Sequence, residues 1–377
     1  MKKFNLKQIV VLLLIFAMAF SVWGCSKTEP TGTPEGESEQ SQEQQPATEG
    51  ETFEFTDSVG RTVTLPKNLD KVAVSGPLAQ IALFALCPDK LVGIASAWDK
   101  TAEKFLDTKY YNLPELGQLY GGKGELNLET LLASGAQVVI DVGEPKDSVA
   151  EDLDALQKQT GIPFVHITAK TENTGDAYRK LGELLGMKDE AEKIAKYCDD
   201  TYAKMKTLSE SVEKVNVLYC TGDAGLNVIA KGSFHAEIID MMANNVAEVA
   251  EPSSKGTGNE VDMEQLLTWD PDVILFSPES AYATVGSDAA WSKMKAISTG
   301  KYYEVPYGPY NWMGFPPSVQ RYLGMLWMAE VLYPEKAGLN MYDEVAAYYE
   351  MFYHCQLTKE QYDELVQNSL AEVDNAA

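Results

Sequence analysis

The sequence predicts an α/β protein with two lobes of like construction, because one helix-strand unit occurs twice and β and α patterns alternate along the chain. The two copies, 125–144 (ELNLETLLASGAQVVIDVGE) and 260–279 (EVDMEQLLTWDPDVILFSPE), align without a gap. Each copy starts at a helix-capping residue, Asn127 or Asp262, runs through a short apolar helix and continues into a β-branched strand. A unit repeated in both halves of a chain indicates two related lobes.

Residues 1–25 are predicted to form a targeting segment rather than part of the fold. Basic residues precede an apolar run at 9–22, which is too short to span a bilayer because a spanning helix needs about 20 apolar residues. The end of this segment resembles the lipobox of bacterial lipoproteins, in which a cysteine, here Cys25, is lipidated. Trp23 departs from that pattern, and an ordinary cleaved signal peptide is the alternative. Several acyl chains would anchor the protein stably.

Residues 26–50 are rich in Ser, Glu, Gln, Thr, Pro and Gly and lack apolar periodicity, which predicts a disordered tether. The formal net charge of −25 argues against nucleic acid as a partner and against a polybasic contact with anionic lipid. The expected location is therefore the outer face of the bacterial cytoplasmic membrane, with the lipid anchor as the membrane contact.

The first lobe is expected at 51–172. Alternating apolar and polar residues predict a β-hairpin over 53–66. After it, β-branched runs alternate with segments of helical spacing, which predicts a mainly parallel sheet covered by helices. The expected strands are 71–74, 92–95, 138–140 and 164–167, and the expected helices are 77–87, 102–106, 129–133 and 150–159.

Residues 173–214 have apolar residues at helical spacing among many charges, which predicts a long connecting helix interrupted near Gly186. Such a connector is stiffer than paired hinge strands and predicts limited closure. The second lobe is expected at 215–377, and after Pro334 it carries two terminal helices without an assigned role. Its expected strands are 215–219, 228–229, 273–276 and 302–305, with a helix at 234–243.

Four cysteines follow the targeting segment: Cys87, Cys198, Cys220 and Cys355. No CxxC spacing and no neighbouring histidine cluster supports a zinc site, so no metal site is expected. Buried free thiols are the main interpretation, and one disulfide is the alternative.

Four segments together resemble the substrate-binding proteins of ABC importers for iron complexes and cobalamin. They are the opening DSVGRTVTLPKNLDKVAV, the repeated pair, the long connector and the closing PPSVQRYLGMLWMAEVLYPE, and they cover about 53–334. The resemblance implies two Rossmann-like lobes with parallel sheets, joined by a long connecting helix, and a ligand cleft between the lobes. It also implies a monomer that catalyses no reaction, holds no cofactor and delivers a small-molecule metal complex to the transmembrane subunits of an importer.

In that family each lobe presents one glutamate to the permease. The matching residues here are Glu129 and Glu264, each two positions after a helix cap. The alternative is a helix-dipole role, since an acid in a first helical turn stabilises a helix by about 0.3–1 kcal/mol.

Ligand contacts are expected from cleft loops at the C-terminal ends of the strands of both lobes. The nominated residues are Ser75, Trp98, Tyr120 and Glu144 in the first lobe, and Asn227, His235, Tyr282, Tyr310, Trp312 and Arg321 in the second. For the aromatic residues, the alternative is a packing role. For His235 it is a role at the start of a helix, and for Arg321 it is a position that faces the core or the solvent. The aromatic, Gly and Pro residues gathered in 307–317 suit a large planar or chelated ligand.

The chain has only three arginines, Arg61, Arg179 and Arg321, and the first two lie in the predicted hairpin and connector. A highly anionic catecholate complex needs several converging cations, so this class is disfavoured. An iron complex of hydroxamate type or haem is the main hypothesis. Cobalamin and an oxyanion such as molybdate or tungstate remain alternatives.

An extracytoplasmic hydrolase is the alternative from another class. The sequence has no GxSxG or HExxH motif, and its three histidines are scattered. Two glutamates at helix starts in separate lobes would also lie too far apart for paired acid catalysis. A ligand sensor or adhesin with the same fold is a third possibility.

Overall fold

The computed structural model describes residues 51–120 and 125–370. The described residues form one compact unit. The predicted signal segment, the lipidation of Cys25 and the tether at 26–50 lie outside the described residues.

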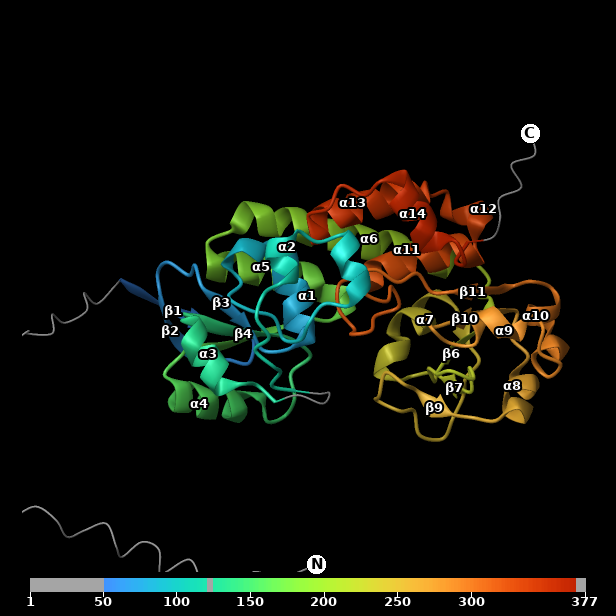
Figure 1. Ribbon diagram of the computed structural model, residues 1–377, viewed down its shortest axis with the longest axis horizontal. Helices are drawn as coiled ribbons and strands as arrows, with labels where there is room; N and C mark the ends of the chain where they lie inside the picture. The colour runs from blue at the N-terminus through green and yellow to red at the C-terminus, as the bar shows by residue number, and fades with distance from the viewer. Residues whose placement is uncertain (1–50, 121–124, 371–377) are drawn as a thin grey trace, which may run out of the picture. The chain divides into compact units, whose positions relative to one another are not determined.

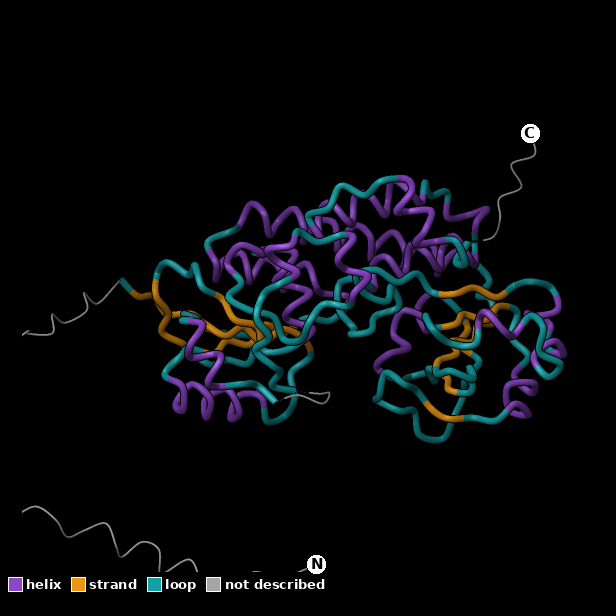
Figure 2. The backbone as a smooth tube through the Cα atoms, in the orientation of Figure 1, coloured by secondary structure: helices purple, strands orange, loops and turns teal. Residues whose placement is uncertain are grey.

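The first lobe opens with the predicted hairpin, in which β1 (Thr52–Thr56) pairs antiparallel with β2 (Thr62–Pro66). Its sheet has three parallel strands in the order β3-β4-β5, namely Val72–Val74, Val138–Gly143 and Phe164–Thr168 (Figures 1 and 2). The strands are almost wholly buried, as expected for a parallel sheet covered on both faces. The helices of this lobe are α1 (Pro77–Leu86), η1 (Pro88–Lys90), η2 (Lys100–Lys104), α2 (Thr108–Tyr111), α3 (Leu128–Ser134) and α4 (Val149–Thr160).

Two elements of this lobe differ from the sequence prediction. The expected strand at 92–95 is not a strand. In this region only single residues pair with neighbouring segments, in the isolated bridges of Val72 with Leu91 and of Ile94 with Glu115. The expected helix at 102–106 is the 3₁₀ helix η2, which begins at the capping carboxylate of Asp99.

The connector consists of two helices rather than one. After η3 (Thr171–Asn173), α5 (Thr174–Leu185) ends at Gly186, whose φ of 68° is in the left-handed region that glycine tolerates. The chain then continues as α6 (Lys188–Ser211), the longest described helix. The predicted interruption near Gly186 is therefore confirmed.

The second lobe has a six-stranded sheet in the order β11-β10-β6-β7-β9, with β8 paired to β6. Strands β11 (Tyr302–Glu304), β10 (Val273–Phe276), β6 (Asn216–Thr221) and β8 (Asn244–Asn245) pair in parallel. The short strands β7 (Asn227–Val228) and β9 (Asn259–Glu260) are antiparallel, so this sheet is mixed. Its helices are η4 (Phe234–Ala236), α7 (Glu237–Met242), α8 (Met263–Trp269), α9 (Tyr282–Val285), η5 (Trp291–Lys293) and α10 (Lys295–Ser298).

The last helices of the described residues are α11 (Arg321–Leu332), α12 (Pro334–Ala337), α13 (Met341–Tyr353) and α14 (Lys359–Val366). The terminal helices, which the sequence predicts to pack on the second lobe, also contact the first, because α13 packs against α1. His354, which follows α13, lies with Nε2 3.0 Å from the Phe84 carbonyl oxygen. The Tyr349 ring contacts Phe105 with centroids 5.2 Å apart.

One buried hydrophobic cluster joins the two lobes. It contains Val74 and Ile140 of the first sheet, one face of the second sheet through Tyr219 and Leu275, and helices α1, α5, α6, α11 and α13. The alternate residues of the second sheet, such as Leu218, form a separate cluster on its other face, following the two-residue period of a strand. A continuous core between lobes opposes large hinge motion.

All four cysteines in the described residues are free thiols. Cys87, Cys198 and Cys220 are buried, and burial raises the pKa of each thiol, to about 12 for Cys87. Inert core thiols are the expected chemistry for such positions.

Candidate ligand-binding site

A cavity of about 620 Å³ lies at the carboxyl ends of the second sheet and is the candidate ligand site. Its lining includes Thr221 and Gly222 at the end of β6, residues 277–279 after β10, and Tyr307 after β11. Asp99 of the first lobe also lines it, so both lobes contribute. Ligands of open α/β sheets bind at this edge, and the volume falls in the range of small-molecule sites.

Aromatic rings form much of the cavity wall. Phe315 contacts Tyr219 edge-on, with centroids 6.0 Å apart, and stacks on His235 at 4.9 Å. A Cβ atom on Gly256 would lie 2.8 Å from the Phe315 ring, so this wall requires glycine there. Burial, followed by the charge of Arg321, lowers the pKa of His235, which keeps its imidazole neutral at neutral pH.

Polar groups hold the strand ends in place. Asn311 Nδ2 donates to the Tyr219 hydroxyl at 3.1 Å, and Asn311 Oδ1 accepts the Met313 N–H at 2.8 Å. Thr221 Oγ1 donates to the Thr257 carbonyl at 2.8 Å. The cavity therefore has a largely preformed wall, which reduces the entropy lost on binding.

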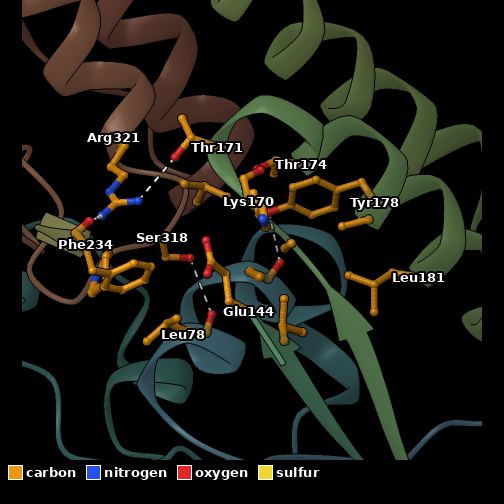
Figure 3. Close-up of a pocket in the computed structure, with 17 residues that line it drawn as sticks. Leu78, Glu144, Lys170, Thr171, Thr174, Tyr178, Leu181, Phe234, Ser318 and Arg321 are labelled. Carbon is orange, nitrogen blue, oxygen red and sulfur yellow. Dashed lines mark hydrogen bonds between the residues drawn. The ribbon is translucent and has the colours of Figure 1, made fainter. Parts of the chain in front are cut away.

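A much smaller cavity, of about 40 Å³, lies beside Arg321 where the two lobes meet (Figure 3). Arg321 Nη2 donates to the Phe234 carbonyl at 2.7 Å, and Nη1 donates to Thr171 Oγ1 at 3.2 Å and to the Glu237 carboxylate. Burial lowers the pKa of Arg321, and the nearby carboxylates of Glu237 and Glu144 oppose that effect. The guanidinium thus has a counter-ion within the protein.

The first lobe has a polar network that crosses from the end of β3 to residues within β4 and β5. Ser75 Oγ donates to Asp141 Oδ1 at 2.5 Å, and His166 Nδ1 lies 2.7 Å from Asp141 Oδ2. His166 Nε2 lies 3.2 Å from Thr168 Oγ1. The carboxylate separates the serine from the histidine, so the hydroxyl has no base to activate it as in a Ser-His-Asp triad.

The sequence-nominated residues divide into three groups. Asn227 lines the 620 Å³ cavity, and Glu144 and Arg321 line the 40 Å³ cavity. The other seven line neither: Ser75, Trp98, Tyr120, His235, Tyr282, Tyr310 and Trp312. Contact with a ligand stays a prediction for all ten.

The seven residues outside the two linings have other partners. The Trp98 indole donates to the Tyr110 carbonyl at 3.2 Å, and the Tyr120 hydroxyl donates to Asp152 at 2.8 Å. Gln80 Nε2 donates to the Tyr310 hydroxyl at 3.0 Å.

Two of these seven are held mainly by packing. Trp312 is fully buried in the shared core. Tyr282 packs against Tyr302, with ring centroids 5.5 Å apart.

The sequence interpretation did not nominate several residues that line the larger cavity: Asp99, Tyr219, Thr221, Glu279, Tyr307 and Phe315. The internal repeat held a usable signal, because Glu279 occupies the same place in its copy as Glu144 does in the other. Each glutamate follows the corresponding strand, β10 or β4, and each lines a cavity. Asp99 had no such signal, since its position depends on the 3₁₀ turn that it caps.

The repeated helices are alike in detail. Asn127 accepts the Thr130 N–H at the start of α3, and Asp262 accepts the Gln265 N–H at the start of α8. Glu129 and Glu264 lie exposed in the first turns of these helices. Both carboxylates are therefore accessible to a partner.

Among residues 51–120 and 125–370, no group of three or more His, Cys, Asp or Glu side chains could hold a metal ion. Across the same ranges, no helix has the length and apolar character needed to cross a bilayer.

The comparison with known families decides the class of protein. The model of the family named periplasmic binding protein matches residues 83–307. The chain belongs to this periplasmic binding protein family. Like other members, it is an extracytoplasmic solute-binding protein of an ABC importer, delivers a small ligand to the importer's membrane subunits, and is not an enzyme.

Three relatives place this periplasmic binding protein more closely. It is 26% identical over 330 residues to the molybdate-binding protein MolA of Haemophilus influenzae, covering 79% of this chain and 90% of MolA. A solute-binding protein of an ABC transporter from Sulfurospirillum deleyianum superposes with a TM-score of 0.76 at 28% identity, covering 83% of this chain and 99% of that one. A periplasmic solute-binding protein from Veillonella parvula gives 0.71 at 26%, covering 85% and 98%.

Proposed function

We propose that this periplasmic binding protein captures an iron complex, of siderophore or haem type, and delivers it to its importer. The observation that carries the proposal is the cavity of about 620 Å³ with Tyr219, Tyr307 and Phe315 in its lining. Rigid aromatic rings supply contact area to a bulky chelate at low entropic cost. The metal arrives within the ligand, so the protein needs no resident cofactor.

Molybdate or tungstate is the second candidate, favoured by the 26% identity to a molybdate-binding protein. The hydroxyl groups of Thr257 and Ser277 in the cavity lining are available to an oxyanion. The cavity is far larger than a single tetrahedral oxyanion, which is why the iron complex ranks first. Cobalamin ranks third, because only the aromatic walls support it.

Calorimetric titration of the purified protein with ferric hydroxamates, haem, cobalamin, molybdate and tungstate tests the proposal. Saturable binding of a ferric complex below micromolar concentration, with millimolar molybdate unable to compete, would support it. Tight binding of molybdate alone would replace it with the second candidate.

Delivery is proposed to use Glu129 and Glu264, which the family resemblance assigns to arginine pockets on the two transmembrane subunits. Both are exposed at the starts of equivalent helices. Glu129→Ala with Glu264→Ala should leave ligand affinity unchanged and reduce uptake by cells. Lost ligand binding in a folded double variant would contradict this role.

We further propose that Cys25 carries the lipid anchor. Incorporation of a labelled fatty acid should occur in the wild-type protein and be lost in Cys25→Ala. Equal labelling of both proteins would exclude this site.

A further inference from the structure

We propose that the 620 Å³ cavity selects ligands with net positive charge, through the carboxylates of Asp99 from the first lobe and Glu279 from the second. This inference rests on the proposed function, since it concerns the ligand of the same site. It adds a charge preference that the aromatic walls alone would not give.

The charges around the cavity are unbalanced. Asp99 and Glu279 are its only charged lining residues within the described ranges, and no lysine, arginine or histidine lines it. Lys100 and Lys255 are sequence neighbours of lining residues, yet their side chains are exposed and do not line it. A ligand in this cavity therefore meets two negative groups and no positive one.

The arginine nearest this region does not restore the balance. Arg321 is 4% exposed, and Glu237 is its counter-ion. Its remaining contacts are to Thr171 and to the carbonyl of Phe234. An anionic ligand would have to break this ion pair to gain a cation, and breaking a buried pair leaves an uncompensated charge.

Tyr307 lines the same cavity as the two carboxylates. Burial raises the pKa of this tyrosine to about 12, and the negative charges of Asp99 and Glu279 add to the effect. Asp99 also accepts hydrogen bonds from the backbone N–H and the hydroxyl of Thr101, both at 2.8 Å, which orients its carboxylate. A cation placed beside the Tyr307 ring would gain from both charges and from the ring face.

The backbone at Glu279 fixes where its carboxylate lies. Its φ is +61°, in the left-handed region that residues other than Gly, Asn and Asp rarely adopt. The turn around it is closed by the Ser280 N–H, which donates to the Ser277 carbonyl at 3.1 Å. Such strain clusters at functional sites, and here it presents an exposed carboxylate that has no ion pair in the described chain at the cavity edge.

Two cavity carboxylates give a measurable preference. Unit charges about 8 Å apart, at an effective dielectric constant near 60, change an equilibrium on the order of threefold. Two carboxylates together therefore give about tenfold for each unit of ligand charge. The preference should shrink as salt is raised, because exposed charges are screened.

The test uses one linear trihydroxamate that ends in an amine. Three hydroxamates neutralise Fe³⁺, so its ferric complex has one positive charge from the ammonium group. Acetylation of the amine gives a neutral complex, and succinylation gives an anionic one with the same metal centre. Calorimetry with the full-length protein in detergent should rank them cationic, neutral, anionic, with about tenfold between steps at low salt.

The variant Asp99→Asn with Glu279→Gln should abolish the ranking. Asparagine retains the capping oxygen that accepts the Thr101 N–H. The matched control is Glu335→Gln with Glu190→Gln, which removes two exposed charges from residues that do not line the cavity. If the general acidity of the chain caused the preference, both double variants would weaken the ranking to the same small extent, and the inference would be wrong.

The outcomes separate the two proposals. Equal or reversed affinities for the three complexes in the wild-type protein would overturn the charge selection and leave the iron-complex function standing. No binding of any of them, with tight binding of molybdate, would overturn both. If the double variant does not fold, the single variants Asp99→Asn and Glu279→Gln test the assignment, since each should lower the step between complexes from about tenfold to about threefold.

Discussion

Removing either partner of the Arg321–Glu237 ion pair should destabilise the fold, and the two losses should differ in a defined order. Arg321 is 4% exposed, whereas the Glu237 side chain is 36% exposed. Removing one partner of a fully buried pair costs about 3–5 kcal/mol, mostly because the other charge stays buried and unpaired. The cost therefore depends on which charge is left behind.

Arg321→Met leaves the carboxylate, which water can partly solvate, so the expected cost is about 2–3 kcal/mol. Glu237→Gln leaves the buried guanidinium, and the expected cost is about 3–4 kcal/mol, since Glu144 nearby compensates it in part. The double variant leaves neither charge behind. Its loss of unfolding free energy should therefore be smaller than the sum of the two single losses, by at least about 1 kcal/mol.

Urea unfolding followed by circular dichroism measures these differences, provided that the transition is two-state. A loss of about 3 kcal/mol should also lower Tm by roughly 4–5 °C in a protein of this size. Strictly additive losses, or a larger loss for Arg321→Met than for Glu237→Gln, would refute the account of the pair as a buried charge and its counter-ion.

Three further predictions follow from the described contacts. Burial lowers the pKa of His235, so the folded state loses stability as the pH falls below the ordinary histidine pKa near 6.5. His235→Gln should therefore weaken the dependence of Tm on pH between pH 7.5 and 5.5. An unchanged pH profile of Tm would contradict this. Leu131→Ala and Leu266→Ala, at equivalent buried positions of the repeated helices, should each cost about 2–5 kcal/mol in urea unfolding, and a loss under 1 kcal/mol at either would show that its cavity collapses. Lys104→Met, which removes an exposed ion pair with Glu364, should change stability by less than about 1 kcal/mol, and a larger loss would mean that α14 depends on this pair.

The internal repeat made much of the fold predictable. Its caps, Asn127 and Asp262, lie where a capping residue must precede an apolar helix, and both accept the expected N–H group. Buried strands such as β4 and β10 were equally clear, because β-branched runs need cover on both faces. The local sequence pattern was therefore enough to predict these helices and strands.

The cavity was less predictable because tertiary contacts decide which loop residues face it. Tyr310 and Trp312 lie in the aromatic segment that drew attention, yet the Tyr310 hydroxyl accepts a hydrogen bond from Gln80, and Trp312 is fully buried. Phe315, in the same segment, lines the cavity instead. Composition identifies such a loop, but the direction of each ring depends on residues far away in the sequence.

The shared core explains why the cavity is largely preformed. In a protein with a strand hinge, each lobe has its own core and the ligand brings the lobes together. Here α13 packs on α1 of the first lobe and on α11 of the second, and one hydrophobic cluster continues through these helices. Opening the lobes widely would expose buried side chains such as Phe352 and Tyr349, each of which stabilises the closed arrangement by about 1.5–3 kcal/mol. Selectivity must therefore come from groups already in place at the cavity, which is where Asp99 and Glu279 lie.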